Sequence, residues 1–255
     1  MKIINKQQIV VAASTEADVA EAKNLALQLQ LPFVTQPGNY AWMLICEGDI
    51  LSLRSPIATK PFYVDFAHTA FLRRLKQATV ARELLARAVG LKSGVKLSVL
   101  DGTAGWGSDS MVLAKLGAQV TALERSPIVA ALLANGIQRA RKIPLLKEVV
   151  LNLHLADTQD FLPTTAHDYD VIYLDPMFPA SPNSALVKKP LQLLQNLVGF
   201  DEAGDVDQLI AQAFQSGYKR LVIKRPVWAK PLFKTPDFSV SSGSIRFDVS
   251  CQLKY

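Results

Sequence analysis

Acidic residues follow four successive apolar runs of the sequence, and each run has the length of a buried β-strand. The acids are Asp101, Glu124, Asp157 and Asp175. Ligands of open α/β sheets bind outside the carboxyl ends of parallel strands, so these side chains should gather at one edge. Carboxylates there could hold ribose hydroxyl groups, the amino group of a base, or a positively charged ligand.

A glycine-rich turn directly follows the first of these strands. The segment D-G-T-A-G-W-G places Gly102, Gly105 and Gly107 before a helix that is opened by Ser108 and Asp109. Strand, glycine turn and helix are typical of a nucleotide-cofactor site, because glycine lets the backbone approach a ligand closely.

The order of the glycines and the charge beside them indicate which cofactor binds. A dinucleotide fingerprint reads G-x-G-x-x-G, whereas this turn reads G-x-x-G-x-G. A pyrophosphate prefers a helix N-terminus without nearby negative charge, but Asp101 and Asp109 flank this one. Acids suit the ammonium and sulfonium groups of S-adenosylmethionine (SAM). We therefore expect SAM rather than NAD, with Ser108 and Asp109 capping the helix near the amino-acid end of SAM.

The next two strand ends offer contacts for the rest of the cofactor. Glu124 is placed to bind ribose hydroxyls, and the alternative is a solvated acid before a helix. Arg125 either holds the cofactor or faces solvent. Asp157 and Thr158 could recognise the adenine amino group, and the alternative for Asp157 is a helix N-cap.

A second motif, V-I-Y-L-D-P-M-F-P, spans residues 171–179. An acid–Pro–x–aromatic turn is typical of amino methyltransferases. An exocyclic amine is a poor nucleophile, because its lone pair is delocalised into the base. Asp175 and the rigid turn at Pro176 can accept its hydrogens and aim the nitrogen at a methyl group, and Phe178 can stack on the base. The alternative, a simple Asp-Pro turn, does not explain why this motif coincides with the glycine turn.

Strands and helices alternate from residue 95 onward, which predicts an α/β fold with a mostly parallel sheet. The tail, residues 238–253, reads as two strands, so an antiparallel strand should close the sheet. Residues 161–168 read as a connection. The expected strands are 95–100, 119–123, 149–155, 169–174 and 220–223, and the expected helices are 108–116, 127–141, 185–198 and 205–217.

The first part of the chain has a different pattern. Residues 1–66 predict a small α/β appendage with a strand at 9–12, a helix at 15–29 and a hairpin of 41–46 and 50–53. Residues 67–92 predict a helical connector dominated by one long helix, 71–89. Its arginines are either a solvated face or a basic lip against phosphates. Residues 93–255 form the main domain.

Composition excludes some classes of protein. A net charge of +6 and a pI near 9.3 permit a polyanionic partner such as RNA. The two cysteines, Cys46 and Cys251, have no metal-ligand spacing, so we expect no metal site. The chain has neither an uncharged apolar stretch of about 18 residues nor a signal-peptide pattern. We therefore expect a cytoplasmic protein without a membrane partner.

The two motifs and their surroundings resemble the ribosomal RNA small subunit methyltransferase J family. The resemblance covers about residues 61–250, and its segments are VLDGTAGWGSDSMVLAKLGAQVTALERSPIVAALLANG, VIYLDPMFP, SALVKK, VIKRP and RFDV. It implies a Rossmann-like class I SAM-dependent methyltransferase with a seven-stranded sheet. The implied substrate is guanine N2 of 16S rRNA, at position 1516 in rRNA numbering. The implied SAM contacts are Ser108, Asp109, Glu124, Arg125, Asp157, Thr158 and Asp175.

Basic residues after the second motif fit an RNA substrate, either 16S rRNA or the small ribosomal subunit. They are Lys188, Lys189, Lys224, Arg225 and Arg246. The lysine pair also fits plain solvated charge. Three other functions remain open: methylation of DNA adenine, methylation of a protein glutamine amide, and RNA binding by a SAM fold without catalysis. Intact Glu124 and Asp175 argue against the last of these.

Overall fold

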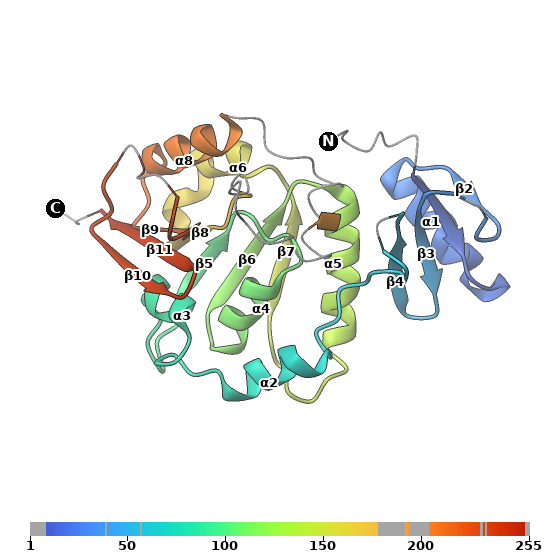
Figure 1. Ribbon diagram of the computed structural model, residues 1–255, viewed down its shortest axis with the longest axis horizontal. Coiled ribbons are helices and arrows are strands. Elements are labelled where there is room, and N and C mark those ends of the chain that lie inside the picture. Colours follow the sequence, from blue (N-terminus) through green and yellow to red (C-terminus); the bar gives the residue numbers. More distant parts are fainter. Residues whose placement is uncertain are drawn as a thin grey trace.

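A computed structural model describes residues 9–38, 40–56, 58–177, 192–193, 204–229, 232 and 234–252. Its strands form two sheets (Figure 1). The larger sheet has the strand order β10-β11-β9-β8-β5-β6-β7. No helix in the part of the chain that the structure describes is long and apolar enough to cross a membrane.

The larger sheet confirms the predicted fold class, a mostly parallel seven-stranded sheet with an antiparallel closing strand. Within the described residues, neighbouring strands from β9 to β7 run parallel, whereas β11 runs antiparallel to both β9 and β10. The bounds are β5 Ser98–Asp101, β6 Gln119–Glu124, β7 Leu151–Leu155, β8 Val171–Leu174, β9 Arg220–Pro226, β10 Phe238–Ser242 and β11 Ile245–Cys251.

The strand order creates one switch point, between β5 and β8. The chain leaves β5 toward β6 and β7 on one side and leaves β8 toward β9 on the other. Asp101 pairs with Tyr173 in register, and the Gly102 amide donates to the Tyr173 carbonyl at 3.0 Å. The glycine turn and the Asp-Pro motif therefore lie side by side, where ligands of such sheets bind.

Helices cover both faces of this sheet because successive strand side chains alternate between the faces. Val99, Val120 and Val222 share one apolar core with α3, α4 and α5. Leu100, Ile172 and Ile223 share another with α6 and α8. The bounds are α3 Leu84–Val89, α4 Ser108–Lys115, α5 Pro127–Ala140, α6 Thr158–Thr165 and α8 Asp205–Gln215.

The smaller sheet has the strand order β2-β1-β3-β4 and stands beside α5 (Figure 1). The β3–β4 hairpin matches the predicted one. Asn135 of α5 joins the two parts: its Oδ1 accepts from the Leu51 amide and its Nδ2 donates to the Asp49 carbonyl, both at 3.0 Å. The bounds are β1 Ile9–Ala13, α1 Val19–Leu29, β2 Phe33–Val34, β3 Trp42–Glu47 and β4 Ile50–Arg54.

Two predicted elements were wrong. The expected helix 71–89 is two helices, α2 Thr69–Gln77 and α3, because the Thr79 carbonyl and hydroxyl accept from the backbone of the intervening turn. The expected connection 161–168 lies in α6 and a short 3-10 helix, in spite of Pro163. The predicted helix 185–198 falls almost entirely outside the described residues.

Candidate functional site

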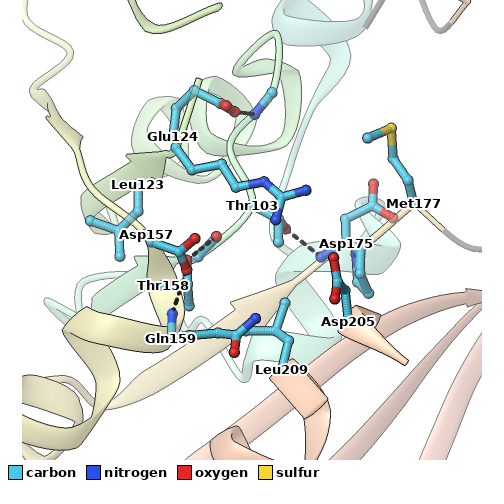
Figure 2. Close-up of a pocket in the computed structure, with 14 residues that line it drawn as sticks. Thr103, Leu123, Glu124, Asp157, Thr158, Gln159, Asp175, Met177, Asp205 and Leu209 are labelled. Atoms are coloured by element: carbon cyan, nitrogen blue, oxygen red, sulfur yellow. Dashed lines mark hydrogen bonds between the residues drawn. The ribbon is translucent and has the colours of Figure 1, made fainter. Parts of the chain in front are cut away.

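A cleft opens at the switch point (Figure 2). Eight residues predicted from the sequence line it: Gly102, Gly105, Glu124, Arg125, Asp157, Thr158, Asp175 and Pro176. Six further lining residues were not predicted: Thr103, Leu123, Gln159, Met177, Asp205 and Leu209.

The glycine turn is held against the end of β6 by its own backbone. The Ala104 amide donates to the Leu123 carbonyl and the Gly105 amide to Glu124 Oε2, both at 3.0 Å. Gly105 has a φ of +52°, a conformation that side chains other than glycine rarely adopt. A Cβ at Gly102 would lie 2.7 Å from side-chain carbons of Thr158 and Leu174, so the floor of the cleft requires glycine there.

Glu124 braces the turn as well as lining the cleft. Besides the Gly105 bond, its Oε1 accepts from the Ser126 amide at 2.8 Å. The side chain is buried, and burial raises the pKa of Glu124 against the opposing effect of these amides. Each carboxylate oxygen has a second lone pair, so the geometry leaves room for ribose hydroxyls as well.

Asp157 and Thr158 fix the far wall of the cleft. Asp157 is the N-cap of α6 and accepts from the Gln159 amide at 2.8 Å, so its N-cap role is confirmed. The Thr158 hydroxyl donates to the Gly102 carbonyl (Figure 2). Recognition of adenine by this pair stays a prediction.

Four predicted cofactor residues lie outside the lining of this cleft: Asp101, Gly107, Ser108 and Asp109. The expectation that Ser108 and Asp109 cap α4 was wrong, because Gly107 is the N-cap and takes a φ of +74°. Asp109 instead turns toward the sheet, where its Oδ2 accepts from the Tyr173 hydroxyl at 2.7 Å.

Asp101 is fully buried beneath the turn. Its Oδ1 accepts from the Thr103 amide at 3.1 Å, and its Oδ2 is bonded to the Ser110 hydroxyl. Burial raises the pKa of Asp101 to about 7, although these two hydrogen bonds lower it. These bonds connect Asp101 to the turn and to α4, and its contact with the cofactor stays a prediction.

Asp175 is placed between the glycine turn and β9. Its amide donates to Thr103 Oγ1 at 2.6 Å, and its Oδ2 lies 2.7 Å from Lys224 Nζ. Its side chain is 38% exposed, into the cleft that it lines. Burial raises the pKa of Asp175; Lys224 opposes this rise and Asp109 adds to it. Phe178, the predicted stacking residue, lies outside the described residues.

The basic residues of β9 are placed differently from the prediction. Neighbouring residues of a strand point to opposite faces, so Lys224 and Arg225 cannot share one RNA surface. Arg225 is 5% exposed and pairs with Asp248 at 3.1 Å, which leaves its guanidinium inaccessible to a phosphate. Arg246 lies 2.8 Å from the same carboxylate and is 23% exposed. Lys188 and Lys189 lie outside the described residues.

Comparison with known proteins identifies the family. A family model described as a putative SAM-dependent methyltransferase matches residues 24–252. A protein of Coxiella burnetii, named ribosomal RNA small subunit methyltransferase J, is 41% identical over 245 residues, which are 94% of this chain and 96% of that protein. The chain belongs to the ribosomal RNA small subunit methyltransferase J family. It is a SAM-dependent methyltransferase.

Other members agree with this assignment. The methyltransferase J of Alkalilimnicola ehrlichii is 43% identical over 240 residues, 90% of each chain. The crystal structure of a SAM-dependent methyltransferase from Neisseria gonorrhoeae covers 95% of both chains, with a TM-score of 0.71 and 33% identity. The fold seen here is therefore that of a solved SAM-dependent methyltransferase.

The cleft of this methyltransferase suits SAM by charge. Among the described residues, four carboxylates line it, those of Glu124, Asp157, Asp175 and Asp205, against one guanidinium, that of Arg125. Negative lining attracts the sulfonium and ammonium of SAM and repels a pyrophosphate. The residues present therefore fit the cofactor, and within the described residues no cluster of potential metal ligands is found.

Proposed function

We propose that this methyltransferase transfers a methyl group from SAM to the exocyclic N2 of a guanosine in 16S rRNA, at position 1516 in rRNA numbering. The observation that carries the substrate class is the identity of 41% with a protein named for ribosomal RNA of the small subunit. The Asp-Pro turn beside an acidic cleft supports transfer to an amine. We place the activity in the cytoplasm, where ribosomal subunits are assembled and methylated.

The lining residues have distinct proposed roles toward SAM. SAM supplies an electrophilic methyl group on its sulfonium sulfur. Glu124 would accept from the ribose hydroxyls, and Asp157 with Thr158 would meet the adenine. Gly102 and Gly105 let the backbone approach the cofactor. Arg125 closes the rim of the cleft.

Asp175 is the proposed catalytic residue. Its carboxylate would accept a hydrogen from guanine N2, which increases electron density on nitrogen and aims its lone pair at the methyl carbon. The N2 nitrogen would take the methyl group as the bond to the sulfonium sulfur breaks and leaves a neutral thioether, and the N2 proton would pass to the Asp175 carboxylate. Pro176 keeps the turn rigid, and Phe178 would stack on the base.

The contacts with RNA belong to the same proposal. The net charge of +6 favours a polyanion, and Lys188, Lys189 and Arg246 stay the predicted contacts. The division into an appendage of residues 1–66, a connector of 67–92 and a catalytic domain of 93–255 is likewise proposed. In this arrangement the appendage stands beside α5 (Figure 1).

Replacement of Asp175 tests this mechanism. We expect Asp175→Ala to lower kcat by roughly 100-fold or more, because the amine loses its acceptor. We expect the SAM dissociation constant to change less than about threefold, since the other lining residues remain. The measurements are transfer of tritiated methyl groups to small subunits that lack the modification, and calorimetric titration with SAM.

Asp160→Ala is the matched control, since Asp160 is an exposed acid on α6 and does not line the cleft. It should keep wild-type kcat. Parallel reactions with naked 16S rRNA and with assembled subunits identify the form of the substrate. Transfer to DNA or to a glutamine-containing protein, with none to either RNA substrate, would refute the proposed function.

A further inference from the structure

Lys224 lies between two carboxylates at the carboxyl end of β9. Its Nζ is 2.8 Å from Asp109 Oδ2 and 2.7 Å from Asp175 Oδ2. Its side chain is only 22% exposed. A lysine in this position has two of its three N–H bonds directed at carboxylates, so it is poorly placed to bind an RNA phosphate.

The partner on the other side, Asp109, is itself fixed. Its Oδ2 accepts from the Tyr173 hydroxyl at 2.7 Å, and Asp109 belongs to the first turn of α4. Its side chain is 17% exposed. Lys224 therefore joins the helix that follows the glycine turn to the carboxylate that follows β8. This connection occupies Asp175 Oδ2 with a hydrogen bond from Lys224.

We propose that Lys224 is a positioning residue for methyl transfer, which orients the Asp175 carboxylate and keeps it in the acceptor form. This inference rests on the proposed function, because it assumes that Asp175 receives a hydrogen from the substrate amine. A protonated Asp175 would offer a hydrogen instead of accepting one. The positive charge of the partly buried Lys224, 2.7 Å away, opposes that protonation.

Protonation of Asp175 depends on the charged groups around it. Burial raises the pKa of Asp175, Lys224 lowers it, and Asp109 raises it again. The same carboxylates more than offset the burial of Lys224 and raise its pKa, so it stays charged. Asp175 interacts electrostatically with Asp101 on β5, Asp109 on α4, Tyr173 on β8 and Lys224 on β9. Arg74 on α2 acts on Asp109, and Arg125 and Asp205 line the cleft together with Asp175.

Variants of Lys224 test the proposal. We expect Lys224→Gln to lower kcat at least 30-fold, with less than a threefold change in KM for RNA, and to move the acid limb of the kcat profile upward by at least one pH unit. We expect Lys224→Arg to retain the wild-type acid limb, because it keeps the charge. Its loss of kcat, on a logarithmic scale, should be at most two thirds of the loss in Lys224→Gln. Lys219→Gln is the control, since Lys219 pairs with Asp170 at 2.9 Å and directly precedes β9, at the end of that strand opposite to Lys224. It should match the wild type.

Two further experiments, a double variant and an NMR titration, test the proposal if Lys224→Gln does not fold or if the RNA substrate is not the right one. If Lys224→Gln does not fold, Asp109→Asn combined with Lys224→Gln removes one charge of each sign, and its kcat should stay at least 30-fold low. Carbon-13 NMR titration of aspartate carboxyls in the ligand-free protein, assigned with Asp175→Ala, should show a higher pKa for Asp175 in whichever Lys224→Gln variant folds. This titration needs no RNA, so it holds even if the substrate is misassigned.

The proposal is overturned if the folded variant keeps wild-type kcat, or if the Asp175 titration is unchanged. It is also overturned if KM for RNA rises while kcat is constant, which would make Lys224 an RNA contact. Equal losses in Lys224→Arg and Lys224→Gln, with unchanged pH profiles, would indicate a merely structural role.

Discussion

The acidic residues that follow the strands differ in burial, and burial separates their roles. Asp175 is 38% exposed and can meet a substrate, whereas Asp101 is 1% exposed and can only support the turn above it. Glu124 combines both roles, because its oxygens accept backbone amides while the residue lines the cleft. Residue type alone therefore does not distinguish a reacting group from a supporting one.

The protonation of Asp101 makes stability depend on pH. Its pKa is about 7 in the folded protein, against 3.8 as the ordinary value. Between these values the folded state binds more protons than the unfolded state, so this group's contribution to stability is present at low pH and lost as pH rises through about 7. Asp101→Asn keeps an acceptor for the Thr103 amide, and its Nδ2 would donate to the Ser110 oxygen in place of the bond that the Ser110 hydroxyl now donates; this side chain does not titrate.

We expect the free energy of unfolding of Asp101→Asn to exceed that of the wild type increasingly from pH 4 to pH 7, by on the order of 1–4 kcal/mol at the upper end. Urea denaturation at several pH values measures the difference. A difference between the two proteins that is independent of pH would show that Asp101 is ionised throughout.

At the scale of elements, the glycine turn is shaped by packing as well as by backbone conformation. Gly107 has a φ of +74°, and a Cβ there would collide with the side chain of Leu133, which is fully buried on α5. Gly94 has a φ of +77° with open space around it. An alanine at either position would be strained by the positive φ, but only an alanine at Gly107 would also collide with Leu133.

We expect Gly94→Ala to destabilise the fold by about 1–2 kcal/mol, the cost of a left-handed conformation. Gly107→Ala should cost roughly 1–3 kcal/mol more, because the core around Leu133 must also rearrange. Denaturation by urea compares the two variants. Equal losses would mean that Leu133 moves aside freely.

Local sequence patterns predicted the strands of the larger sheet, the glycine turn and the closing hairpin, because each depends on a few neighbouring residues; the short strand β2, Phe33–Val34, was not predicted. They did not predict α6, because Pro163 argues against a helix. The helix forms nevertheless, since Asp157 caps its N-terminus and Leu162 is buried in the core. Arg225 forms its ion pair with Asp248, which lies on another strand. The spacing of residues within one segment does not predict such a pair between strands. One sequence signal was not used in the prediction of RNA contacts. Side chains alternate along a strand, so the neighbours Lys224 and Arg225 face opposite sides of the sheet.

At the scale of the whole molecule, a continuous apolar core runs from the appendage into the larger sheet. Asn135 connects the two parts by hydrogen bonds to the backbone of β4 and of the turn before it. Gly136 lies so close to Val64 that a Cβ would come within 2.6 Å of its side chain. These contacts predict that the appendage and the catalytic domain unfold together.

We expect Asn135→Ala to lower the free energy of unfolding by about 1–2 kcal/mol and to speed hydrogen exchange in β4, because the Leu51 amide loses its acceptor. Lys142→Ala should leave both unchanged, since its ion pair with Asp49 is well exposed. Rapid exchange confined to the appendage in the wild type would contradict joint unfolding.

The identity of the methylated nucleoside decides whether this protein methylates N2 of a guanosine in 16S rRNA. Small subunits from a strain that lacks this gene would be incubated with the protein and SAM, and the 16S rRNA digested and analysed by mass spectrometry. We expect one N2-methylguanosine at position 1516, formed by the wild type and by Asp160→Ala but not by Asp175→Ala. A methylated adenosine, or a methyl group elsewhere on guanine, would contradict it.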